Sequence, residues 1–181
     1  MISRLQYAAS QILGFVRNPP EHFAKDTSDY KALRDIVALI LLVTLPLEVK
    51  NFTHVPDLYT TYLIVVILLV WPMSWVILNI SANIFNYYLQ WVSYKRVLLF
   101  QPDLLITQRI VAYASISHII SAIPISNIVY VSELISIVLS GIGIHVLYKV
   151  KVQHGIGLVL VYHLIIFVLA FGISILLGLL R

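Results

Sequence analysis

The chain has 181 residues, of which 60% are apolar and only 11% are charged, against roughly 45–50% and 25% in an average soluble domain. The apolar residues form runs of about 20, enough to cross a hydrocarbon layer about 30 Å thick, so the composition excludes an ordinary water-soluble fold and predicts a polytopic membrane protein. Membrane topology accounts for most of the net charge of +4, so nucleic acid is not expected as a partner. Because the chain has no cysteine, disulfides, thiolate metal sites and a cysteine nucleophile are excluded.

The N-terminal segment, residues 1–31, is expected to precede the membrane spans as a cytoplasmic or interfacial region. Apolar residues recur at helical spacing from Ile2 to Val16, which predicts an amphipathic helix. This helix could lie flat among the lipid headgroups or pack in the cytosol. Pro19 and Pro20 are expected to end it, because proline lacks a backbone donor.

Residues 32–181 are expected to form a single all-α domain, a bundle of five transmembrane helices. The expected spans cover residues 32–47, 58–78 with a continuation to 94, 104–123, 128–148 and 156–180. The first is the shortest, and the second is the longest because no residue between Leu58 and Tyr94 is charged. A helix of that length, about 55 Å, must tilt, bend or leave the membrane, and Pro72 is placed to kink it.

Loop charges predict the orientation of these spans. Five Lys and Arg residues precede the first span, three lie between or just inside spans two and three, and two lie between spans four and five. These ten share one side of the membrane, against Lys50 and Arg181 on the other. The positive-inside rule therefore predicts a cytoplasmic N-terminus and an external C-terminus.

Small residues concentrate toward the end of the chain. Six of the seven glycines follow residue 140, so close backbone approach is expected around the last two spans. Ala170, Ser174 and Gly178 repeat the spacing of small residues that membrane helices use for packing.

Ionisable groups inside the spans are the best functional pointers, because burying them in lipid is costly. His118 and Glu133 are predicted to lie at one depth on consecutive antiparallel spans. They could form a structural clasp between the helices, exchange a proton, coordinate a cation with a third ligand, or not touch. His145 and His163 lie nearer the inner side and could simply donate to a carbonyl oxygen, because neither a second carboxylate nor an HxxxH spacing accompanies them.

Four amide side chains form a second polar feature, in the continuation of the second expected span. Asn79, Asn83, Asn86 and Gln90 fall within a stripe about 60° wide on one helix face. Such a stripe could bond a neighbouring helix, lie in the headgroup region or line a hydrated pathway.

The sequence offers little support for an enzyme. It has no nucleophile elbow, phosphate-binding glycine loop, HExxH motif or paired acidic motif, and Glu133 is the one carboxylate well inside a span. We therefore predict a protein without catalytic residues, cofactor or bound metal.

Two segments resemble the Yip family, five-span membrane proteins with a Ypt-interacting-protein domain. Phe15-Val-Arg-Asn-Pro-Pro-Glu-His-Phe23 is similar to that domain's entry segment, and Val111-Ala-Tyr-Ala-Ser115, followed by Ile119 to Ile125, is similar to its third span. The resemblance implies a non-enzymatic protein that organises membranes or, in eukaryotes, recruits small GTPases. It implies a Golgi or endoplasmic reticulum membrane in a eukaryote and the cell membrane in a prokaryote.

Two functions follow as expectations. The first is a non-catalytic scaffold of the Yip type that packs in the lipid bilayer with copies of itself or with other membrane proteins. The alternative is a small proton- or ion-coupled transporter or channel that uses Glu133, His118 and the amide stripe.

Single-cysteine labelling tests the predicted topology cleanly, because the chain has no native cysteine. Lys95→Cys and Lys151→Cys should react from the cytoplasmic side, whereas Thr53→Cys and Ser126→Cys should react from outside. Labelling of positions 53 and 95 from the same side would contradict a single crossing by the second span.

Overall fold

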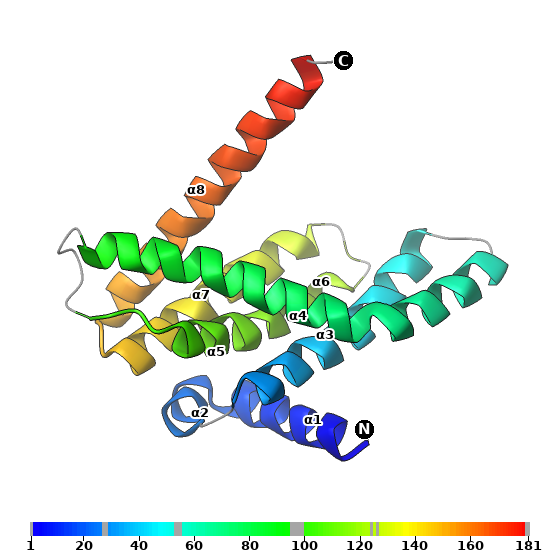
Figure 1. Cartoon of the computed structure of the whole chain (residues 1–181), viewed down its shortest axis with the longest axis horizontal. Helices are drawn as coiled ribbons and strands as arrows, with labels where there is room; N and C mark the ends of the chain where they lie inside the picture. Colours follow the sequence, from blue (N-terminus) through cyan, green and yellow to red (C-terminus); the bar gives the residue numbers. More distant parts are fainter. Residues whose placement is uncertain are drawn as a thin grey trace.

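The computed structural model of the chain describes residues 2–26, 29–52, 56–94, 100–123, 125 and 127–179, and the side chains of all of these except residues 2, 47–52, 56–60, 176 and 179. The described residues form helices and no strand, which confirms the all-α class. The elements are α1 (Ile2–Arg17), α2 (Pro19–Lys25), α3 (Tyr30–Phe52), α4 (Pro56–Tyr94), α5 (Leu104–Ala114), the 3₁₀ turn η1 (Ser115–Ser117), α6 (His118–Ser121), α7 (Ile128–Tyr148) and α8 (Val152–Leu179) (Figure 1). The loop charges Lys95 and Arg96, the labelling positions Thr53 and Ser126, and Leu180 at the end of the fifth expected span lie outside the described residues.

Four helical stretches in the described part of the chain are long and apolar enough to cross a membrane. They are Thr61–Tyr94 in α4, Leu104–Ser121 across α5, η1 and α6, Ile128–Tyr148 in α7, and Val152–Ile175 in α8. The expected first span, residues 32–47, is helical within α3 but is not one of these four. The part of the chain that the structure describes thus has four helices that could span a membrane, which is consistent with a helical membrane protein, and the fifth span stays a prediction.

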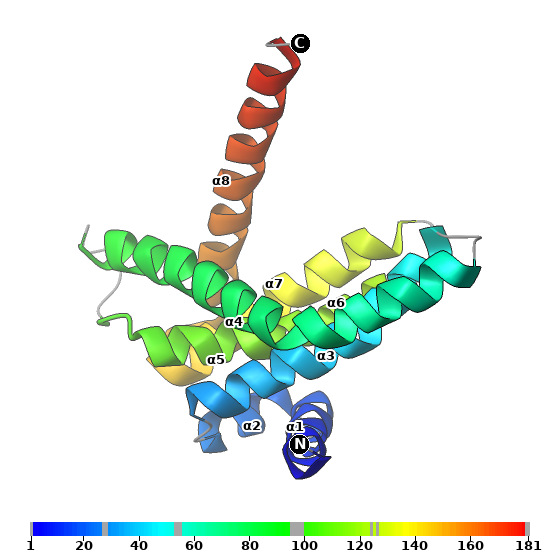
Figure 2. The ribbon, with the colours of Figure 1, turned by 45° about the vertical axis from the view of Figure 1, so that its right-hand side comes forward.

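Helix α4 turns back along α3 and then bends away from it (Figure 2). It is a single helix of 39 residues with Pro72 in its interior, about 58 Å long at the usual rise. Proline removes one backbone hydrogen bond and crowds the preceding turn, so the bend has a local cause in the sequence. Beyond the bend, α4 packs against α5, and α5 and α6 pack against α7.

The core combines apolar faces from most of the helices. Its largest fully buried side chains include Leu33 and Ile36 of α3, Leu78 and Leu89 of α4, Ile110 and Tyr113 of α5, Ile144 of α7 and Val159 of α8. On α4, by contrast, Met73, Val76, Ile80, Ile84, Tyr87, Trp91 and Tyr94 are exposed. Their spacing of three or four residues places them on one side of the helix, as expected for a face that contacts lipid.

The N-terminal helices are anchored to the bundle by ion pairs. The guanidinium of Arg4 donates two hydrogen bonds of 2.7 Å to the carboxylate of Asp35 on α3, and Asp35 is only 4% exposed. Arg4 and Arg34 also lie over the ring of Trp71 on α4, each under 6 Å from its centroid, within cation–π range. Helix α1 thus packs on protein through Ala8 and Phe15, while Leu13 and Val16 stay exposed.

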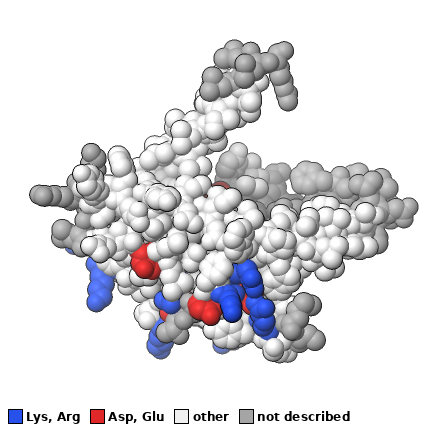
Figure 3. Space-filling view, viewed as in Figure 1, with Lys and Arg blue, Asp and Glu red and all other residues white. Residues whose placement is uncertain are grey.

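Charge is distributed unevenly over the molecule. In the view of Figure 3, the Lys and Arg side chains gather along the lower and left-hand parts, whereas the described part of the projecting helix α8 carries none. The C-terminal part of α8 projects from the bundle (Figure 1), and its described large apolar side chains between Leu164 and Leu177 are exposed.

Close backbone approach occurs where α7 and α8 meet. A Cβ atom at Gly141 would lie 2.8 Å from the Cα of Ile156, and one at Gly155 would lie 2.5 Å from the carbonyl oxygen of Gly141. The later small-residue repeat takes no part in this contact, because Ala170 and Ser174 are exposed and a Cβ at Gly178 would meet nothing within 4 Å.

These glycines predict a matched pair of stability changes. Gly141→Ala or Gly155→Ala should lower the stability of the protein by about 1–3 kcal/mol, because the added methyl group collides with backbone that cannot move independently. Gly172→Ala is the control, since nothing lies within 4 Å of its Cβ position. The measurement is the melting temperature in detergent. Equal melting temperatures for all three variants would contradict the close contact of α7 and α8.

Candidate functional site

The helix that begins at Leu104 is interrupted in its middle. Serine hydroxyls bond carbonyl oxygens three residues back: Ser115 to Ala112 at 2.7 Å and Ser117 to Ala114 at 2.8 Å. Such bonds compete with the regular helical ladder, and the chain tightens into the turn η1. Ser132 of α7 donates to the carbonyl oxygen of Ser117 at 2.8 Å. Residues Leu104–Ser121 still form one stretch long and apolar enough to cross a membrane, as the sequence predicted for residues 104–123, but the 3₁₀ turn within it was not predicted.

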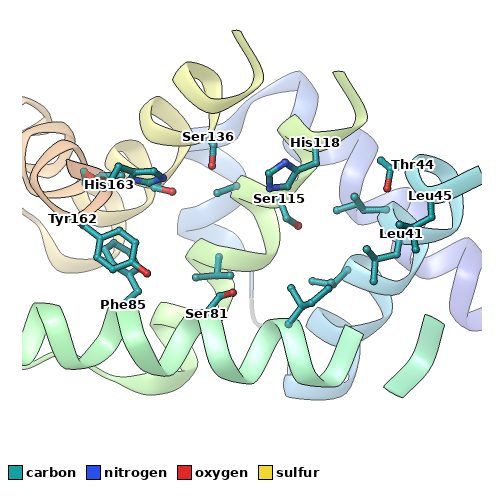
Figure 4. Close-up of a pocket in the computed structure, with 17 residues that line it drawn as sticks. Leu41, Thr44, Leu45, Ser81, Phe85, Ser115, His118, Ser136, Tyr162 and His163 are labelled. Atoms are coloured by element: carbon teal, nitrogen blue, oxygen red, sulfur yellow. Dashed lines mark hydrogen bonds between the residues drawn. The ribbon is translucent and has the colours of Figure 1, made fainter. Parts of the chain in front are cut away.

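A cavity of about 370 Å³ lies beside this break. Helices α3, α4, α5, α7 and α8, together with η1 and α6, contribute to its wall. Figure 4 shows the labelled side chains of several helices converging on this space. The polar residues in the wall are Thr44, Ser81, Ser115, His118, Ser136, Ser140, Tyr162 and His163.

Most of these polar side chains form no hydrogen bond with the described residues. This is true of Thr44, Ser136 and Ser140, which are between 4% and 9% exposed. It is also true of the half-buried side chains of Ser81 and Tyr162 and the exposed side chain of His118, whereas Ser115 and His163 bond backbone carbonyl oxygens. None of the polar atoms without a partner is closed off from solvent, so the wall can bond water or a polar ligand.

His163 connects the cavity with Glu133. Its Nδ1 lies 2.9 Å from the carbonyl oxygen of Val159, and a carbonyl can only accept, so Nδ1 carries the hydrogen. The remaining nitrogen, Nε2, lies 4.0 Å from Oε2 of Glu133 on α7. This separation is too long for a hydrogen bond, so the two groups form an ion pair only when the imidazole is protonated.

His118 and Glu133, predicted at one depth, do not form a contact in the described structure. The imidazole of His118 points into the cavity (Figure 4), and Glu133 lies beside His163 instead. Equal distance in sequence from a connecting turn sets the depth of two residues along their helices. It does not set the direction in which each side chain points around its helix axis. Because η1 precedes His118, the helical phase of residues 104–114 does not carry through to it.

His145 lies outside the cavity. Its Nδ1 donates to the carbonyl oxygen of Val150, at 2.6 Å, where α7 connects to α8. The side chain is exposed, so a role in fixing this connection accounts for its contact. Within the described residues, no three His, Asp or Glu side chains come together as a metal site would require.

The amide stripe of α4 serves several separate contacts. Asn79 donates to the hydroxyl of Tyr30 on α3 at 2.7 Å, and Asn86, which is buried, accepts a hydrogen bond of 3.0 Å from Thr107 on α5. Asn83 donates to the carbonyl oxygen of Asn79 in its own helix, and Gln90 is exposed. None of the four appears among the residues that surround the cavity.

Sequence reasoning missed the serines of α7. Ser132, Ser136 and Ser140 recur every four residues, so they share one face of the helix, and all three are buried. This spacing in an otherwise apolar helix was the available signal. Ser132 supports η1, and the other two lie in the cavity wall.

The segments of residues 15–23 and 111–115 meet in one aromatic cluster. Phe15 of α1 stacks on Tyr113 of α5 with centroids 4.8 Å apart, and Phe23 of α2 meets the same ring at 5.6 Å. Nε2 of His22 lies 3.0 Å from the hydroxyl oxygen of Tyr113. Burial lowers the pKa of His22, although the charge of Asp26 opposes the shift. The cluster holds the N-terminal helices against the end of α5.

Comparisons with known proteins return no match: no protein-family model, no curated protein and no solved structure is similar to this chain.

Proposed function

We propose that the protein is a proton-coupled transporter of a small solute, with the cavity as its binding site. The observation that carries the proposal is the position of His163, which lies in the cavity wall and beside Glu133 at once. A solute bound at this wall would then change how readily these two groups take up or release a proton, and their protonation would in turn change solute binding.

Two further features support transport. Ionisable groups at membrane depth are costly and mark proton or substrate pathways in many membrane proteins. Interrupted helices are common at transporter binding sites, because backbone that leaves the regular helix lines a cavity. Here His118 follows such an interruption and points into the cavity.

For the topology we propose five spans, with the N-terminus in the cytoplasm and the C-terminus outside. Helix α3 would supply the first crossing, starting after Asp35, because no charged residue occurs from Ile36 to Leu47. The ion pair of Arg4 with Asp35 is compatible with a position near the cytoplasmic surface.

A scaffold of the Yip type is the second candidate. It is favoured by the aromatic cluster, in which Tyr113 of one family-like segment contacts Phe15 and Phe23 of the other. In this case the exposed apolar half of α8 would pack with copies of the chain or with other membrane proteins. A small GTPase is a partner only through the resemblance.

Proton flux into liposomes tests the transporter proposal. Under an imposed pH gradient, with a pH-sensitive dye inside, the wild-type protein should admit protons faster than protein-free liposomes. Glu133→Gln and His163→Gln should each lower the rate to the protein-free level, because glutamine keeps a polar side chain but cannot exchange a proton.

His145→Gln is the matched control, since His145 lies outside the cavity, and it should retain the wild-type rate. Absence of flux in the wild type would contradict proton coupling and leave the scaffold. Equal flux in the wild type and in both cavity-side variants would contradict the role given to the pair.

A further inference from the structure

We propose that the cavity binds an uncharged, hydroxylated lipid with a single hydrocarbon chain, of the monoacylglycerol type. This inference rests on the proposed function, because it names the class of solute that the transporter would carry. It follows from the charge, the free hydrogen-bonding groups and the apolar end of the cavity.

The wall offers no counterion for a charged ligand. Among the described residues that surround the cavity there is no Lys, Arg, Asp or Glu. Glu133 is not among these residues, and its Oε2 lies 4.0 Å from Nε2 of His163. Since an unpaired charge in a low-dielectric site is strongly unfavourable, a fatty acid anion or an alkylammonium ion would bind poorly here.

The unpaired polar groups instead match hydroxyls. The hydroxyls of Ser136, Ser140 and Tyr162 can each donate and accept a hydrogen bond, and the imidazole of His118 points into the same space. A ligand hydroxyl can also donate and accept, so a ligand with two hydroxyl groups can satisfy several of these side chains together. A purely apolar ligand would leave all of them unsatisfied.

The other end of the cavity is aliphatic. It is lined by apolar residues of α3 that include Leu41 and Leu45. In Figure 4, Leu41 and Leu45 lie at one end of the labelled group, with Thr44 beside them, and Tyr162 and His163 lie at the opposite end, with Ser136 and His118 between the two ends. A molecule with a hydroxylated head and a hydrocarbon chain fits this polarity, whereas a free sugar or polyol would leave the aliphatic end without a partner.

Size restricts the ligand further. The volume of about 370 Å³ is near the lower end of the range for small-molecule sites, about 300–1,000 Å³. Helices would have to separate to enclose a two-chain phospholipid, so a single, short chain is the better match.

Direct binding in phosphatidylcholine nanodiscs tests this inference. The probe is a radiolabelled short-chain monoacylglycerol, with glycerol and the fatty acid of the same chain length as competitors. The monoacylglycerol should bind saturably, and neither glycerol nor the fatty acid should displace it at equal concentration. Displacement of the probe by the fatty acid would contradict a site for uncharged ligands. Displacement by glycerol would contradict a site that requires a hydrocarbon chain.

Loss of wall hydroxyls should weaken binding. Ser136→Ala and Ser140→Ala should each reduce the affinity about fivefold, the effect of losing one ordinary hydrogen bond. Ser10→Ala is the control, because that hydroxyl lies on α1 and bonds the carbonyl oxygen of Tyr7. Melting temperatures measured on the same preparations show whether the variants are folded. Unchanged affinity in both folded wall variants would overturn the proposal.

Glu133→Gln separates this inference from the proposed function. It removes proton exchange but leaves the wall hydroxyls in place, so it should still bind the monoacylglycerol saturably, although it should admit no protons. Glu133-dependent proton flux without any binding of the probe would overturn the ligand class and keep proton coupling. Binding without proton flux in the wild type would overturn proton coupling and keep the lipid site.

Discussion

The architecture depends on one requirement of the bilayer: backbone carbonyls that leave a helical ladder must find partners inside the protein, because lipid offers none. At Ser115–Ser117 the chain leaves the ladder and meets this requirement locally. Hydroxyls of Ser115 and Ser117 bond carbonyl oxygens of α5, and Ser132 supplies the partner for Ser117 from α7. The break is therefore tolerated, and it turns His118 into the cavity.

Close packing elsewhere brings the remaining groups to the same place. Gly141 and Gly155 let α7 and α8 approach until a side chain at either position would collide, and one consequence is that His163 of α8 reaches Glu133 of α7. On the opposite side of α5, Tyr113 is held by aromatic rings from α1 and α2. The interrupted helix is thus supported on both sides, by a hydroxyl from α7 and by the N-terminal cluster.

Much of the fold could be predicted from the composition and the hydrophobic pattern of the sequence. The rotation of each helix about its axis, and the side chains that meet as a result, could not. Uncharged runs predicted the helical membrane class, and the helix through Pro72 to Tyr94 was expected as one unit. Serine back-bonding at residues 115–117 was not foreseen, because the same residues are tolerated in regular membrane helices. The partner of Glu133 could not be derived either. Depth along a helix follows from counting residues, whereas the side that faces a neighbour depends on packing, which here placed His163 beside it and left His118 in the cavity wall.

The central claim is that a polar, hydrated cavity lies inside an apolar bundle, and thiol reactivity tests it most directly. A water-soluble methanethiosulfonate reacts with thiolate, which forms only where water reaches the sulfur. Ser136→Cys lies in the cavity wall, and Leu134→Cys lies on the same helix with its side chain 60% exposed on the outer surface. In a lipid bilayer the account predicts fast reaction at position 136, although it is the more buried, and slow reaction at position 134. Faster reaction at position 134, or none at position 136, would contradict a hydrated cavity.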